Sequence, residues 1–304
     1  MRAWTWPALG LFIAIYAIAL GVLVVTGRPL EDVLGAAVIL GGFLPLVGAL
    51  ACLRMPMPTP PGPWQRGEGW VLLGLLAWIT LFLAGKGPLL DFLVPPTGDP
   101  RWRDTVNTLL KLAAFVGLPA LVIRQGLGWP SVGHPTTSLT RRLVAVAIVA
   151  VAAYAVQALM GSQFHKLMGG DYAQRHWVAG FLACFAWMSV EAGLVEEFFF
   201  RFYLQSRLTA WTRSSLAGVL LGALIFGLAH APGMILRGAG VQEGLGVAPP
   251  VLSTIAYAIT VQGVAGLVFG LLWARTRSLV PLVLLHGFVD ALSNTAAFMD
   301  TWRL

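Results

Sequence analysis

The chain has 304 residues, of which 58% are hydrophobic and only 11% are charged. A mean hydropathy of +0.79 and recurring apolar runs exclude an ordinary soluble domain, in which about 25% of residues are charged. The net charge is +7, but the basic residues are scattered through short connections, which excludes a nucleic-acid partner. Cys52 and Cys184 lie in separate apolar runs and support neither a disulfide framework nor a cysteine-rich metal site.

Eight or nine runs are long and apolar enough for a membrane helix, which needs about 20 residues. The first is longer than the apolar core of a signal peptide, so we expect it to be retained. The fourth is the weakest, because Lys111 lies inside it, and the proline-rich connection at 88–105 is expected to be re-entrant or interfacial. The sequence therefore predicts an all-α, polytopic transmembrane helical bundle with spans near residues 7–26, 32–53, 69–87, 106–123, 143–161, 178–200, 215–236, 251–274 and 278–299.

Basic residues are divided unequally between the two ends of this predicted bundle. With nine spans, eleven Lys and Arg residues fall on the side of the N-terminus and eight on the other side. Because cytoplasmic loops carry the excess of Lys and Arg, the N-terminus and the loops at 201–213 and 275–277 are expected to face the cytoplasm. We therefore predict an integral, multi-pass protein of the lipid bilayer, in the plasma membrane if the source is bacterial.

Ionisable side chains inside the apolar runs are concentrated in the second half of the chain. A charge at the bilayer centre costs roughly 2.5 to 3.5 kcal/mol on insertion scales, so such residues indicate a functional site. The sequence thus predicts N-terminal helices of unassigned role at 1–160 and a catalytic membrane core at 161–304. The residues in question are Glu191, Glu196, Glu197, His230, His286 and Asp290.

Helical spacing predicts what these groups contact. Glu197 and Arg201 are four residues apart and therefore neighbours on one helix face, as expected for a structural ion pair. Glu196 is rotated by about 100° from Glu197 and is available for another contact. His286 and Asp290 also share a face, which suits a carboxylate that orients an imidazole or a pair that binds one ligand.

A third run contributes His230, four residues after Phe226. If the three runs converge, Glu196, His230, His286 and Asp290 form a His, His, carboxylate cluster in a polar cavity within the membrane. Such a cluster suits either water activated by a metal, such as zinc bound to these four residues, or a glutamate general base that acts on water directly. Both lead to hydrolysis, and the residues leave both open.

Each group alone has a simpler explanation. A single membrane histidine often serves helix packing, and a Glu–Arg pair can be an interfacial ion pair. Three such segments in about 100 residues favour a common site. A hydrolase that acts within the membrane therefore has two alternatives, a non-catalytic scaffold or immunity-type protein and a transporter or proton relay. Glu191 either lines the same cavity or pairs elsewhere.

The three motifs, in this order on successive membrane helices, resemble those of the CPBP intramembrane protease family, which contains the type II CAAX prenyl endopeptidases. They are Glu-Glu-x-x-x-Arg at 196–201, Phe-x-x-x-His at 226–230 and His-x-x-x-Asp at 286–290. The segment 277–281 is similar to the lead-in that this family shows before its last motif. The resemblance covers roughly residues 178–299.

The resemblance implies a membrane-embedded hydrolase with Glu196, Glu197, His230, His286 and Asp290 as its catalytic set. Glu196 would activate the water with help from His230, and Glu197 with Arg201 would hold the helix. His286 and Asp290 would bind a metal or stabilise the oxyanion. Asp290 stands where CAAX-cleaving members have Asn, and because an ionised carboxylate only accepts hydrogen bonds, this difference favours a metal.

The resemblance also implies where the reaction takes place and on what. The substrate would be a membrane-associated peptide or protein precursor, and the active site would lie nearer the cytoplasmic side.

Overall fold

The computed structural model describes the chain except for residues 1–3, 29, 127–130, 170–173 and 238–249. All regular structure in the described part is helical. It consists of α1 (Thr5–Val25), α2 (Glu31–Val38), η1 (Ile39–Phe43), α3 (Leu44–Ala51), α4 (Glu68–Leu93), α5 (Pro100–Leu112), η2 (Ala113–Gly117), α6 (Leu118–Gly126), α7 (Leu139–Met160), α8 (Ser162–Gly169), α9 (Gln174–Met188), η3 (Ser189–Leu194), η4 (Glu197–Gln205), α10 (Ser206–Thr212), α11 (Ser215–Arg237), α12 (Val251–Tyr257), η5 (Ala258–Gly263), α13 (Val264–Thr276) and α14 (Leu279–Trp302), where η marks π-helical turns.

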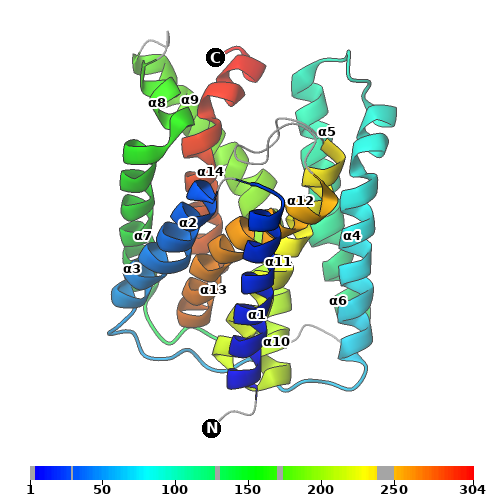
Figure 1. Ribbon diagram of the computed structural model, residues 1–304, viewed down its shortest axis with the longest axis vertical. Helices are drawn as coiled ribbons and strands as arrows, with labels where there is room; N and C mark the ends of the chain where they lie inside the picture. Colours follow the sequence, from blue (N-terminus) through cyan, green and yellow to red (C-terminus); the bar gives the residue numbers. More distant parts are fainter. Residues whose placement is uncertain (1–3, 29, 127–130, 170–173, 238–249) are drawn as a thin grey trace.

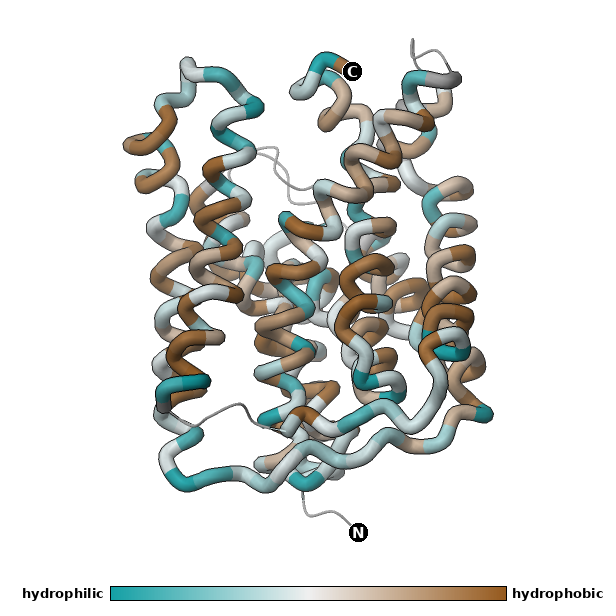
Figure 2. The backbone as a smooth tube through the Cα atoms, turned by 180° about the vertical axis from the view of Figure 1, so that it is seen from behind, coloured by the Kyte–Doolittle hydropathy of each residue, from teal (hydrophilic) through white to brown (hydrophobic). Residues whose placement is uncertain are grey.

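Nine helical stretches in the described residues are long and apolar enough to cross a membrane. They match the predicted runs one for one, so the predicted all-α, polytopic bundle is confirmed. Hydrophobic residues gather along the middle of the helices and hydrophilic residues near their ends (Figure 2). The chain is a multi-pass integral membrane protein.

Two predicted boundaries were wrong. Of the two alternatives for the connection at 88–105, the re-entrant one is wrong, because α4 continues through Pro88 to Leu93 and α5 begins at Pro100, while the interfacial one stays a prediction. Pro100 occupies the first turn of α5, where its missing N–H costs nothing, and the Asp99 side chain caps the helix by accepting from the Arg101 N–H.

The other wrong boundary is the end of the sixth span. The predicted run stopped at residue 200, whereas the helical stretch continues from His176 to Thr212 through the π-helical turns η3 and η4. Glu196 and Glu197 therefore lie in the middle of a long helical stretch rather than at its end. Such π-helical turns are rare and occur often at functional sites.

Helices α4, α5 and α6 lie on one side of the molecule and α2, α3 and α7 on the other, with α11 and α13 between them (Figure 1). One apolar core joins α4 and α6 to η4 and α11. A second joins α3 and α7 to α13 and α14. The N-terminal helices are thus packed directly against the helices that carry the sequence motifs.

Close contact between η3 and α14 depends on glycine. A Cβ atom at Gly287 would lie 2.6 Å from the backbone N and Cα of Ser189, and a Cβ atom at Gly193 would lie 2.5 Å from the carbonyl oxygen of Val283. Small residues let membrane helices approach each other to backbone contact. This contact brings the segment with Glu196 and Glu197 next to the segment with His286.

Two arginines, Arg207 and Arg275, hold the extended segments at the end of the bundle where the N-terminus lies. Arg207 forms a fully buried ion pair with Glu68 and donates to the carbonyl oxygens of Gly62 and Pro63. Arg275 donates to the carbonyl of Cys52. The loops that contain the predicted excess of basic residues therefore meet at one end of the bundle, which we call the basic end.

We predict that Gly287→Ala destabilises the protein and disturbs the site beside it. The added methyl group has no room against Ser189, and overpacking of this kind costs typically 1 to 3 kcal/mol. Thermal unfolding of the purified protein measures the effect. Gly74→Ala is the matched control, because nothing lies within 4 Å of its added Cβ atom. Equal melting temperatures for the two variants would contradict the predicted helix contact.

Candidate active site

The three motif segments converge on one point between η4, α11 and α14. The Oε2 atom of Glu196 lies 3.9 Å from Nε2 of His230 and 3.7 Å from Nε2 of His286. Oδ2 of Asp290 lies 3.7 Å from the same nitrogen of His286. Four residues from three helices, separated by up to 94 positions in the sequence, thus face one another inside the bundle.

Hydrogen bonds on the far side of each imidazole determine which nitrogen faces this point. Nδ1 of His230 lies 2.8 Å from the carbonyl oxygen of Phe226, and Nδ1 of His286 lies 2.8 Å from Oε1 of Glu197. A carbonyl or carboxylate oxygen only accepts, so both Nδ1 atoms carry the proton. In the neutral rings the Nε2 lone pairs then point toward Glu196.

Glu197 serves two partners at once. Its side chain is completely buried; Oε1 accepts from His286, and Oε2 lies 3.6 Å from Nε of Arg201. The predicted pair of Glu197 and Arg201 is therefore present. The group that orients His286 by a hydrogen bond is Glu197 rather than Asp290, because 3.7 Å is too long for such a bond.

Arg201 extends this network to the third helix. Its guanidinium carbon lies 4.3 Å from the centre of the Phe226 ring, within the range of a cation–π contact. The Phe226 ring in turn lies edge-on to His230, with 4.7 Å between the ring centres. Phe226 thus supports His230 with both its carbonyl and its ring.

A cavity of about 330 Å³ opens at these residues. Its lining includes Glu196, His230, His286 and Asp290, while Glu197 lies behind it. The side chains at the cavity differ in their access to solvent. The exposed fraction of the side chain is 8% at His286, 16% at Glu196 and 32% at Asp290.

Residues that the motifs do not contain complete the cavity. Gln157 of α7 and Gln262 of η5 are its other polar side chains, and each could have been noticed as a lone amide in an apolar run. The apolar wall gives no such signal, because its residues resemble any membrane-helix residue. It consists of Leu40, Leu44, Val149, Ala153, Phe226, Val261, Ala265, Val268, Phe269, Leu285 and Val289.

Glu191 belongs to a separate polar cluster. Its Oε1 accepts from Nζ of Lys111 at 2.7 Å and from the side-chain amide of Asn107 at 3.4 Å. The two alternatives for Glu191 are thereby decided in favour of pairing elsewhere. The same contact accounts for Lys111 inside the fourth span, because its charge has a carboxylate partner.

The predicted metal ligands have suitable atom types but not a suitable arrangement. No group of three or more His, Cys, Asp and Glu residues in the described part of the chain could hold a metal ion. Tetrahedral zinc with bonds of about 2.0 to 2.1 Å brings every pair of ligand atoms into contact. His230 and Asp290, by contrast, do not come within ion-pair distance of each other.

Comparison with known families supports the motif assignment. The family described as type II CAAX prenyl endopeptidase Rce1-like matches residues 178–292. This segment contains all three motifs, and the predicted resemblance to CPBP proteases is confirmed. No curated protein and no solved structure gives a match to the chain.

We predict that Glu197→Gln strongly destabilises the protein. The substitution leaves the buried guanidinium of Arg201 without its counter-charge, and removal of one partner from a buried pair costs roughly 3 to 5 kcal/mol. Thermal unfolding measures the loss. Asp91→Asn, which removes the half-exposed partner of Arg103, is the control and should cost less than about 1 kcal/mol. A Glu197→Gln protein as stable as this control would show that Glu197 is not the anchor of the site.

Proposed function

Since residues 178–292 match the Rce1-like protease family, we propose that the chain is an intramembrane endopeptidase. Its substrate would be a membrane-associated peptide or protein precursor, one bond of which is hydrolysed in the cavity between η4, α11 and α14. The observation that supports this best is the convergence of the Glu196 carboxylate and two imidazole Nε2 atoms within 3.7 to 3.9 Å.

Two hydrogen-bond acceptors that face one point suit a water molecule. Glu196 and the neutral His230 can each accept one of its hydrogens, which fixes the oxygen lone pair toward a bound carbonyl carbon. As the oxygen attacks, its proton passes to Glu196, which acts as general base. Glu196 then returns this proton to the leaving nitrogen, so that the carboxylate is regenerated with each turnover.

The negative oxygen that forms on the carbonyl requires a donor. We assign this role to His286, whose Nδ1 is held by Glu197. When His286 is protonated, Nε2–H becomes available to the oxyanion, and removal of one such donor from an enzyme typically costs a factor of 10² to 10³ in rate. Asp290, an acceptor only, would balance the charge of His286 between turnovers.

Zinc remains an alternative within the same proposal. A divalent metal bound to Glu196, His230, His286 and Asp290 would supply an activated water, but the described arrangement gives no ligand sphere from which to derive such a step. We also propose, from the distribution of basic residues, that the basic end faces the cytoplasm. On α11, His230 lies 15 residues after Ser215 at that end and seven before Arg237 at the other, so the candidate active site would then lie nearer the side opposite the cytoplasm, unlike the expectation from the sequence.

We predict that Glu196→Gln abolishes cleavage while the protein still folds and inserts. Loss of a general base lowers rates by about 10² to 10⁴. New peptide termini in membranes of cells that express each variant, identified by mass spectrometry, report the activity. His230→Ala should show the same loss. His134→Ala, with its exposed side chain in a loop, should cleave as the unmodified protein does.

One result would contradict a catalytic role for the cluster. If inserted Glu196→Gln and His230→Ala proteins both yield the same termini as the unmodified protein, the cluster is structural. A cellular phenotype that survives in both variants would then favour the scaffold alternative.

We predict for the metal-free route that the purified, active protein contains no stoichiometric metal and keeps its activity in 1,10-phenanthroline. Elemental analysis by mass spectrometry measures the metal content. One zinc per chain, lost in Asp290→Asn together with activity, would contradict the metal-free route and assign the ligand role to Asp290.

A further inference from the structure

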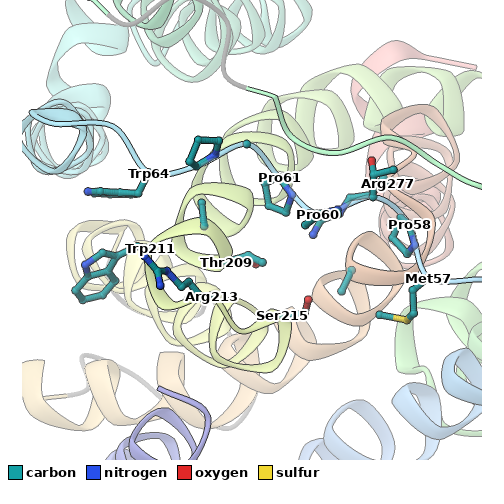
Figure 3. Close-up of a pocket in the computed structure, with 15 residues that line it drawn as sticks. Met57, Pro58, Pro60, Pro61, Trp64, Thr209, Trp211, Arg213, Ser215 and Arg277 are labelled. Carbon is teal, nitrogen blue, oxygen red and sulfur yellow. The ribbon is translucent and has the colours of Figure 1, made fainter. Parts of the chain in front are cut away.

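A second and larger cavity lies at the basic end of the bundle. It has a volume of about 740 Å³, and we call it the basic cavity. Residues 57–64, which connect α3 to α4, line one side of it, and the ends of α10 and α13 line the other. Figure 3 shows Arg277 beside Pro60, with Thr209 and Ser215 across the opening.

The basic cavity is separate from the candidate active site. The two cavities share no lining residue. Ser215, at the start of α11, lines the basic cavity, while His230 on the same helix lines the other. At 1.5 Å per residue, the two positions are about 22 Å apart along the helix.

The charged residues that line the basic cavity all have the same sign. They are Arg213 and Arg277, and the described lining contains no Asp or Glu. Arg213 is exposed, so water can solvate its charge. Arg277 is only 6% exposed, which makes it the more costly charge of the two.

Arg277 has few hydrogen-bond partners for a buried guanidinium with five N–H donors. Its Nη1 donates to the Ser206 hydroxyl at 3.2 Å, and its Nε has no acceptor. That hydroxyl already accepts from the indole N–H of Trp273 at 2.9 Å. Burial lowers the pKa of Arg277 to about 10, so the side chain still carries its charge at neutral pH.

Arg207 is a buried arginine with a structural role, and its partners can be compared with those of Arg277. It is also buried, but it forms an ion pair with Glu68 and donates to three main-chain carbonyl groups. Arg277 has neither a carboxylate nor a carbonyl partner of this kind among the described residues. Its side chain lines the basic cavity instead.

We propose that the basic cavity binds a phosphate group through Arg277, with Arg213 as a second, weaker contact. The planar guanidinium matches the oxygen geometry of phosphate with two parallel hydrogen bonds. The cavity lies at an end of a transmembrane bundle, and the ends of such a bundle meet lipid headgroups, whose abundant oxyanion is phosphate. The apolar walls formed by Met57, Trp64 and Trp211 suit the glycerol and first carbons of a lipid, although a free phosphate ion has the same binding chemistry.

Two probes distinguish these sources in the full-length protein. The protein is purified in an uncharged detergent and titrated with inorganic phosphate, or with dihexanoyl-phosphatidylglycerol below its micelle concentration, and binding is measured by calorimetry. Dihexanoyl-phosphatidylcholine, in which choline offsets the phosphate charge, is the reference. We expect Arg277→Gln to weaken binding at least 10-fold. Arg66→Gln, an exposed arginine near this end that does not line the cavity, should leave it unchanged.

Each outcome has a definite meaning. Binding of the short lipid alone identifies a headgroup site, and binding of inorganic phosphate as well identifies a general phosphate site. No binding of either probe at millimolar concentration overturns the proposal, as does equal binding by Arg277→Gln. If Arg277→Gln does not fold, Arg213→Gln replaces it with an expected loss of about threefold, and unchanged binding in that variant overturns the proposal.

Discussion

The rest of the site depends on the contacts of one buried side chain, the carboxylate of Glu197. One of its oxygens accepts from His286 and the other faces Arg201, so a single side chain determines the tautomer of a histidine on α14 and holds a cation in the interior. Arg201 then contacts the ring of Phe226, whose carbonyl accepts from His230. Three helices are thereby connected through one network of buried polar contacts. Glu196, the neighbour of Glu197, takes no part in this network and is available to face both imidazoles.

Backbone packing makes this network possible. Gly193 and Gly287 let η3 and α14 approach until their main chains touch, and larger side chains at either position would separate Glu197 from His286. The π-helical turns η3 and η4 change the direction of the side chains over a span that is otherwise α-helical. Unusual helix geometry and buried charge thus coincide at this site. Such concentration is expected where function rather than stability has selected the residues.

Much of this could be predicted from the sequence, because the membrane leaves few choices. Apolar runs of about 20 residues can only be helices there, so an all-α fold with eight or nine spans followed directly. Spacing of four residues also correctly paired Glu197 with Arg201. Spacing alone could not show that Glu197 rather than Asp290 orients His286. That contact joins residues 89 positions apart and depends on two glycines that let η3 and α14 approach each other. Nor could spacing identify Leu40 or Val149 as cavity residues, since an apolar side chain in an apolar helix carries no signal.

The central claim is that Glu196 and the two histidines share one water-accessible point inside the membrane. A cryo-electron microscopy structure of the full-length protein in lipid nanodiscs, at a resolution that shows ordered water, tests it directly. The account predicts density for a water or an ion within hydrogen-bond or ligand distance of Glu196, His230 and His286, with Glu197 bonded to His286. A Glu196 side chain turned away from both histidines, toward lipid or another helix, would contradict it.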